Sequence, residues 1–320
     1  MLVSASPSPT PGQPAPDRDW RTVNWSAHER SILIRGHRVN LVDLGAGTPV
    51  LFIHGLSGCW QNWLLNIAAI ARDHRVIAID LPGFGASQMP EGPISVPSYA
   101  ETVTLVCRAL GLDSVAVVGN SMGGFIAAEM SIGTPELVSH LVLVDAAGLS
   151  TEELRHRPLY ALARLARSSG LTRLSRVPDV ARRPGLRRLA LGLIARHPER
   201  FSADLTRTLL GGAGKEGFPE ALLSLSSHRI RDRLDRIGCP TLIVWGANDR
   251  LVPVADAFEL QQSIAGSQLV VFPDSGHVPM LEYPLRFNRV LEGFLSAEGG
   301  RSPSAATGFG RAASRTTGSP

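Results

Sequence analysis

Three residues that could take part in catalysis each follow a short apolar run. Ser121 comes after VAVVGN, Asp249 after LIVWGAN and His277 after LVVFPDSG. A serine hydroxyl is a weak nucleophile and needs an adjacent general base, which a neutral imidazole supplies near neutral pH. A carboxylate can orient the imidazole and stabilise its protonated form. These residue types therefore predict nucleophilic catalysis by Ser121, with His277 as the base and Asp249 as the acid.

Residues 119–123, GNSMG, match the G-x-S-x-G pattern of a nucleophile elbow between a strand and a helix. The glycines are needed because this turn is sharp and brings the strand and the helix close together. The oxyanion formed on attack needs preorganised donors, each commonly worth about 2.7–4 kcal/mol. We predict two backbone N–H donors, that of Met122 at the positive end of a helix and that of Leu56 in the turn HGLSG.

Strand-like and helix-like segments alternate along the chain, which predicts right-handed crossovers and a mostly parallel, eight-stranded sheet with helices on both faces. An antiparallel pair joined near Gly36 opens the sheet. In such sheets ligands bind beyond the carboxyl ends of the strands, where the candidate residues gather. The predicted strands are SILIRG, HRVNLVDLG, TPVLFIHG, RVIAIDLPG, SVAVVGNS, HLVLVDAAG, PTLIVWGAND and SQLVVFPDSGH. The predicted helices are WQNWLLNIAAIAR, SYAETVTLVCRALG, ADAFELQQSIAG and LRFNRVLEGFLSA, with a further helix beginning at Ser121.

The domain organisation follows from one interruption of this alternation. Residues 148–234 have helical periodicity broken by prolines and contain no convincing strand, so we predict a helical cap inserted after the sixth strand. The core is then formed by residues 23–147 and 235–297. The Pro/Ser/Ala-rich residues 1–22 and the similar residues 298–320 are predicted to be disordered.

Composition excludes several classes of protein. The chain is 44% hydrophobic but has no apolar run near 18 residues, and its N-terminus lacks the pattern of a secretory signal. Its three cysteines are widely spaced, which argues against a disulfide framework or a zinc site and fits the cytoplasm. We expect no metal, no organic cofactor and no nucleic-acid partner. The oligomeric state is left open.

The predicted cap is strongly basic. Residues 151–236 carry 18 Lys/Arg and 9 Asp/Glu, against a net charge of +4 for the whole chain. A solvated outer face explains this excess most simply. The alternatives are attraction to a carboxylate-bearing substrate and contact with an anionic membrane surface.

Across residues 23–297 the chain resembles enzymes of the α/β-hydrolase fold. The resemblance is carried by FIHGLSG, IDLPGFGAS, GNSMGGF, VWGANDRLVP and DSGHVPMLEYP, and by the order of Ser121, Asp249 and His277. It implies a serine at the elbow, whereas members with dehalogenase or epoxide-hydrolase chemistry have an aspartate there. Some members place the acid at the end of the preceding strand, which makes Asp145 a rival to Asp249.

Other residues near these motifs have structural explanations beside functional ones. His54 is expected to shape the oxyanion turn, and Asp80 to anchor its own loop. Trp60, Trp63 and Trp245 are expected to pack in the core. Trp60 is also a candidate to border the substrate pocket.

The leading functional hypothesis is hydrolysis of a small, hydrophobic carboxylic ester. The elbow GNSMGG, including Asn120, is similar to that of the meta-cleavage product hydrolases, which cleave a carbon–carbon bond in a vinylogous diketone. Asn120 is therefore a candidate substrate-binding residue. Against that reaction, Val278 stands where those enzymes tend to have tryptophan, and HGLSGCW has fewer glycines than their oxyanion turn. A cofactor-free perhydrolase and a catalytically silent binding protein are further alternatives.

Overall fold

The sheet has the predicted eight strands. The computed structural model describes residues 20–150, 182–211 and 215–297, and its strands follow the order β1-β2-β4-β3-β5-β6-β7-β8. Strand β2 is antiparallel to β1 and β4, while the pairs β4–β3, β3–β5, β5–β6, β6–β7 and β7–β8 are parallel. The strands are β1 (Glu29–Ile34), β2 (His37–Gly45), β3 (Thr48–Ile53), β4 (His74–Ile79), β5 (Val115–Asn120), β6 (Val138–Val144), β7 (Thr241–Gly246) and β8 (Gln268–Phe272).

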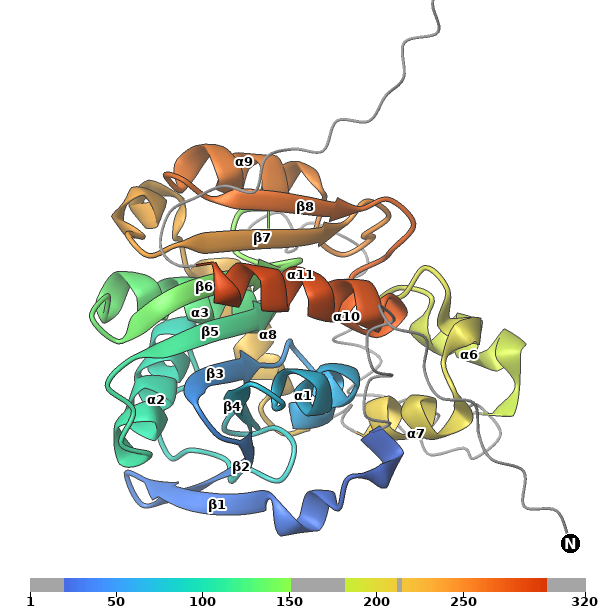
Figure 1. The fold of residues 1–320 in the computed structure, drawn as a ribbon, viewed down its shortest axis with the longest axis horizontal. Coiled ribbons are helices and arrows are strands. Elements are labelled where there is room, and N and C mark those ends of the chain that lie inside the picture. Colours follow the sequence, from blue (N-terminus) through green and yellow to red (C-terminus); the bar gives the residue numbers. More distant parts are fainter. Residues whose placement is uncertain (1–19, 151–181, 212–214, 298–320) are drawn as a thin grey trace, which may run out of the picture.

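Helices cover both faces of the sheet (Figure 1). In β3, Leu51 and Ile53 belong to one apolar cluster, whereas Val50 and Phe52 belong to the other. All four side chains are fully buried, which explains why the strand reads as a continuous apolar run. The first cluster includes α2 (Val96–Ala109), α3 (Met122–Gly133) and α9 (Ala255–Ser263); the second includes α1 (Leu64–Ile70), α10 (Pro279–Glu282) and α11 (Pro284–Ser296).

The described part of the predicted cap is helical. It contains α6 (Pro184–Leu191), α7 (Ala203–Gly211), α8 (Phe218–Ser227) and the short 3₁₀ helices η6 (Pro198–Arg200) and η7 (Arg231–Arg236), with no strand among these residues. Helices α6 and α7 lie toward the carboxyl ends of the parallel strands (Figure 1). The cap boundaries at 148 and 234 stay a prediction. Residues 151–181 of the predicted cap lie outside the described residues, as do residues 1–19 and 298–320 of the segments predicted to be disordered.

Four local details differ from the sequence-based expectations. The predicted helix WQNWLLNIAAIAR divides into η3 (Trp60–Trp63) and α1, because Asn62 N–H bonds to Cys59 O in a tighter i to i+3 turn. Helix α3 begins one residue later than predicted, with Ser121 as its N-cap. The four-residue helix α10 was not predicted. Residues 20–22, at the end of the predicted disordered segment, form η1 (Trp20–Thr22).

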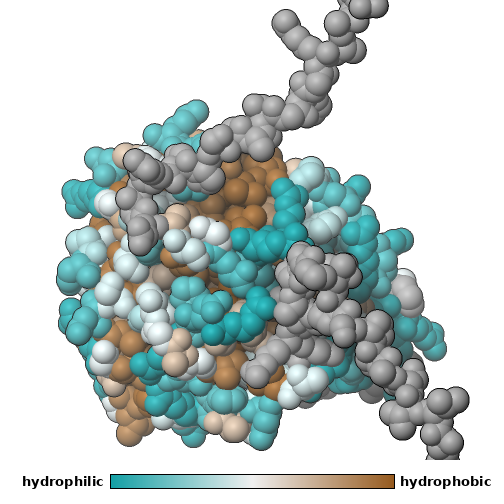
Figure 2. Space-filling view, in the orientation of Figure 1, coloured by the Kyte–Doolittle hydropathy of each residue, from teal (hydrophilic) through white to brown (hydrophobic). Residues whose placement is uncertain are grey.

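The surface is largely hydrophilic at the right edge of Figure 2, where α6 lies. Among the described helices, none combines the length and apolar character needed to cross a membrane. All three cysteines are free, and Cys59 and Cys107 are buried. Burial raises the pKa of both buried thiols to about 12, so these two cysteines stay protonated and act as small apolar residues.

An ion-pair cluster joins the C-terminal end of the predicted cap to α3. Glu129 in α3 accepts two hydrogen bonds from Arg233, at 2.8 and 2.9 Å, and lies 3.0 Å from His228 Nε2. Burial alone would raise the pKa of Glu129, but hydrogen bonds from His228 and Arg233 outweigh it and lower the pKa to about 2. We call this cluster of Glu129, His228 and Arg233 the α3 latch.

The α3 latch should stabilise the fold in a pH-dependent way. Because the pKa of Glu129 is lower in the folded protein than its ordinary 4.5, its contribution is complete above that value and is lost as pH falls through about 2. Glu129→Gln should lower the free energy of unfolding by about 2 kcal/mol at pH 7 and by about half of that at pH 3. Urea titrations of both proteins measure this, and an equal loss at both pH values would contradict it.

Candidate active site

The turn at Ser121 is strained and tightly packed. Ser121 links β5 to α3 with φ 56°, a left-handed backbone conformation that residues other than glycine rarely adopt. A Cβ at Gly123 would lie 2.2 Å from the carbonyl oxygen of Ile53, so only glycine lets α3 approach β3 this closely. Ser121 N–H bonds to Val144 O at 2.9 Å, which fixes the turn to β6. The serine is thus held at a sharp strand-to-helix turn at the carboxyl end of the central strand β5.

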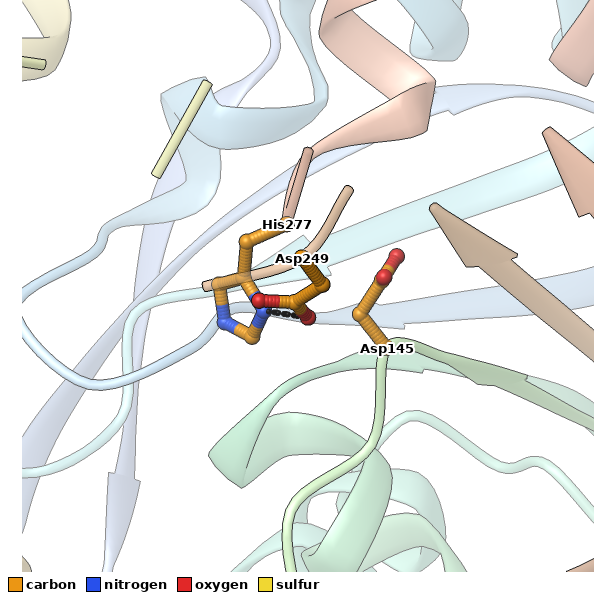
Figure 3. A group of neighbouring side chains, drawn as sticks. All are labelled: Asp145, Asp249 and His277. Carbon is orange, nitrogen blue, oxygen red and sulfur yellow. Dashed lines mark hydrogen bonds and ion pairs between the residues drawn. The ribbon is translucent and has the colours of Figure 1, made fainter. Parts of the chain in front are cut away.

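His277 and Asp249 are joined by a short hydrogen bond. Nδ1 of His277 lies 2.6 Å from Oδ2 of Asp249, and their side chains are 5% and 0% exposed (Figure 3). The other carboxylate oxygen accepts the N–H groups of Leu251 and Val252, at 2.7 and 3.1 Å. With its Nδ1–H donated to the carboxylate, a neutral His277 ring keeps its Nε2 lone pair available as a base.

Asn120 connects the elbow with the histidine loop. Its Nδ2 donates to Val144 O and to His277 O, at 3.1 Å each, and the residue is only 2% exposed. The backbone of His277 is thereby held against the residue that precedes Ser121. Between these described residues the structure brings the histidine and serine segments together, although no hydrogen bond joins Ser121 Oγ to His277.

The turn that follows β3 lies directly against Ser121. A Cβ at Gly55 would be 3.0 Å from Ser121 Cβ, and Leu56 follows immediately. Neither the Leu56 N–H nor the Met122 N–H has an acceptor among the described residues. Both predicted oxyanion donors are therefore free and close to the elbow.

His54 holds this turn in place. Its Nε2 accepts the Leu81 N–H at 3.0 Å, and its Nδ1 lies 2.7 Å from Gly55 O. These contacts require a neutral ring with the proton on Nδ1, and burial lowers the pKa of His54 accordingly. His54 bridges two loops through backbone groups, in agreement with the shaping role expected for it.

Asp80 and the predicted packing tryptophans are buried. Asp80 accepts the backbone N–H groups of Trp60 and Ala86, at 2.7 and 2.8 Å, and so ties its own loop to η3. Trp63 and Trp245 are fully buried. Trp60 is 3% exposed, and its Nε1 has no hydrogen-bond partner among the described residues.

A second carboxyl group, that of Asp145, lies beside Asp249 (Figure 3). Asp145 has φ 45°, is fully buried and accepts the Gly246 N–H at 2.8 Å. Burial raises the pKa of Asp145 well above its usual range, and the neighbouring Asp249 raises it further. The raised pKa favours the protonated form of Asp145, whose Oδ2 has no hydrogen-bond partner among the described residues. From the sequence, Asp145 and Asp249 are alternative candidates for the acid. The structure places their carboxyl groups side by side.

The same three side chains have the composition of a metal site. One ligand atom from each of Asp145, Asp249 and His277 lies within 4.8 Å of the others, in a search of the described residues. A neutral carboxyl group is a poor ligand for a divalent cation, and Asp249 is already bonded to His277. The donor set is therefore a poor fit to a divalent cation.

The chain belongs to the α/β hydrolase fold family, whose model matches residues 48–284. It is 33% identical over 289 residues to a 2-hydroxy-6-oxo-2,4-heptadienoate hydrolase of Pseudomonas putida, covering 84% of this chain and 96% of that protein. The family, the fold and the relatives define a hydrolase.

Two solved structures show how similar the fold is to enzymes of different substrate preference. A meta-cleavage product hydrolase of Pseudomonas fluorescens is 27% identical, with a TM-score of 0.65 over 83% of this chain and 97% of that one. An esterase of Thermogutta terrifontis is also 27% identical, with a TM-score of 0.68 over the same shares. Similarity of the fold therefore does not choose between the two reactions.

A neutral Asp145 should make the fold less stable as pH rises. Because its pKa is raised by folding, its contribution is present below the ordinary value of 3.8 and is lost as pH increases. Asp145→Asn keeps the shape without this dependence, and asparagine tolerates a positive φ. Relative to wild type, the variant should gain unfolding free energy between pH 4 and pH 7, measured in urea. A constant difference between the proteins would contradict a neutral Asp145.

Proposed function

We propose that this α/β hydrolase cleaves a small carboxylic ester through an acyl-enzyme intermediate, with Ser121 as nucleophile, His277 as base and Asp249 as acid. The observation that carries the proposal is the 2.6 Å bond between His277 and Asp249 beside the strained elbow at Ser121. His277 has the carboxylate partner that a base needs, and Asn120 holds its backbone against the elbow.

In the first step the Ser121 Oγ–H proton passes to His277 Nε2 while Oγ forms a bond with the ester carbonyl carbon. The N–H groups of Leu56 and Met122 stabilise the resulting oxyanion, and the start of α3 adds a positive field. His277 then returns the proton to the departing alkoxide as the carbon–oxygen bond breaks. Asp249 stabilises the imidazolium throughout.

In the second step water takes the place of the alcohol. The water oxygen attacks the acyl carbon while His277 accepts a proton from the water. The N–H groups of Leu56 and Met122 again stabilise the oxyanion. Collapse of the tetrahedral intermediate releases the carboxylic acid and restores the Ser121 hydroxyl. No further group is required.

A second candidate reaction is cleavage of a carbon–carbon bond in a vinylogous diketone. The 33% identity to the heptadienoate hydrolase favours it. Such a reaction also needs a proton delivered to carbon, because a carbanion is a poor leaving group. Here Val278 offers no proton, and both N–H groups of the Asn120 amide are taken by backbone carbonyls. Ester hydrolysis needs only the groups already described, and this supports it as the first choice.

Ser121→Ala tests the nucleophile. The variant should fold as the wild type does but lose covalent labelling by a fluorophosphonate and at least ~10³-fold of its ester turnover, because no oxygen is left to form the acyl-enzyme. Labelling is read by mass spectrometry, with circular dichroism as the control for folding. Labelling of the alanine variant at the wild-type rate would exclude Ser121.

The identity of the acid is tested by matched substitutions. Asp249→Asn should reduce kcat by on the order of 10³–10⁴-fold, because the amide cannot stabilise the imidazolium. Asp145→Asn should leave kcat within about threefold, because a neutral side chain replaces a neutral one. Little loss at 249 with collapse at 145 would move the acid to β6.

A substrate panel separates the two reactions. Short- and long-chain p-nitrophenyl esters and a vinylogous diketone should be compared on the same preparation, with Ser121→Ala as the blank. We expect turnover of the short esters. Turnover of the diketone alone would make carbon–carbon hydrolysis the correct assignment, and an inert protein would contradict both.

A further inference from the structure

The loop that carries His277 is bonded directly to the cap. The His277 N–H donates to Ile194 O at 2.8 Å, so the backbone of the proposed base is paired with a cap residue. A Cβ at Gly276 would lie 2.8 Å from Arg196 N and 3.1 Å from Ala195 C. Residues 194–197, which we call the cap strap, therefore lie in close contact with the histidine loop.

Glu282 links the same two segments through one carboxylate. Its Oε1 accepts the Gly276 N–H at 2.6 Å and the Ser275 hydroxyl at 3.0 Å. Its Oε2 accepts the His197 N–H at 2.9 Å. One oxygen thus holds the histidine loop and the other holds the end of the cap strap.

A second, more exposed set of contacts reinforces this junction. His197 Nε2 lies 2.9 Å from Asp274, whose carboxylate also accepts the Tyr283 hydroxyl at 2.9 Å. The hydrogen bond with His197, followed by that with Tyr283, lowers the pKa of Asp274. Asp274 is therefore ionised near neutral pH, and it begins the loop that reaches His277.

We propose that Glu282 is a positioning residue that makes the placement of His277 depend on the seating of the cap strap; this rests on the proposed role of His277 as base. Glu282 is the last residue of α10, the short helix that follows His277, and it does not contact the proposed reacting atoms. When the strap is seated, Gly276, His277 and His197 all have acceptors for their N–H groups. Lifting the strap removes the acceptor for His277 N–H and the donor for Glu282 Oε2.

The physical consequence is that cap and base cannot be displaced independently. Buried N–H groups without acceptors are costly, so the histidine loop would shift to recover hydrogen bonds once the strap has moved. A shifted loop also misaligns the bond from His277 to Asp249. The position of the cap strap and the position of His277 are therefore coupled.

Glu282→Gln tests this coupling with Glu129→Gln as the matched control. The glutamine amide has one acceptor oxygen in place of two. Its NH2 group therefore points at an N–H of either the histidine loop or the cap strap, and that hydrogen bond is lost. We expect kcat for the best ester of the panel to fall by at least ~10-fold, with KM changed by less than ~3-fold. The control loosens the α3 latch, which also joins cap and core but does not contact the histidine loop, and should keep kcat within ~2-fold. Equal effects of both variants would reduce Glu282 to a structural residue and overturn the proposal.

Gly276→Ala repeats the test without changing charge. Its methyl group would force the strap backbone away from the loop while leaving Glu282 intact, and it should give the same loss of kcat. A wild-type kcat in this variant contradicts the coupling. The Gly276→Ala variant also tests the coupling if Glu282→Gln does not fold.

Hydrogen–deuterium exchange provides a readout that does not depend on activity. Glu282→Gln should accelerate exchange in residues 274–283 and in residues 192–200 together, while residues 122–133 stay protected. Acceleration in only one of the two segments would overturn the coupling. If wild type resists the fluorophosphonate but both segments still respond together, the coupling stands and the proposed hydrolysis fails.

Discussion

The left-handed backbone at Ser121 is the constraint on which the site depends. A φ of 56° in a residue other than glycine costs about 1–3 kcal/mol and persists only where its surroundings enforce it. Here the Ser121 N–H is bonded to Val144 O, and Ser121 O accepts the N–H groups of Phe125 and Ala147. The close contact of α3 with β3 leaves the chain no room to relax. The rigid central strands thus hold a half-buried serine at the start of a helix.

The rest of the site is arranged around this fixed point by backbone hydrogen bonds. Asn120 ties the histidine loop to the elbow, His54 ties the oxyanion turn to the loop after β4, and Asp80 ties that loop to η3. Each of these buried polar side chains acts on main-chain groups. Such contacts fix the positions of the proposed catalytic groups through the main chain, and they give these buried polar side chains hydrogen-bond partners.

Sequence predicted the strands and the elbow because both have local signals. The apolar runs before Ser121, Asp249 and His277 end at the same edge of a parallel sheet, so their meeting follows from topology alone. The pairing of Glu282 with His197 could not be predicted, because the two residues are 85 positions apart and join through a main-chain N–H that any residue possesses. The use of the Asn120 amide is hidden for the same reason. The division of η3 from α1 depends on a turn that periodicity does not resolve.

The neighbouring carboxyl groups of Asp145 and Asp249 have an evolutionary consequence. They come from adjacent strands, β6 and β7, and reach the same region beside one imidazole. Burial, and next the charge of Asp249, raise the pKa of Asp145. A lineage that lost the β7 acid would already possess a second carboxyl group in place, and its ionisation would become easier with the neighbouring charge gone. The acid can therefore migrate between strands of this fold without a new residue having to arise at the same moment.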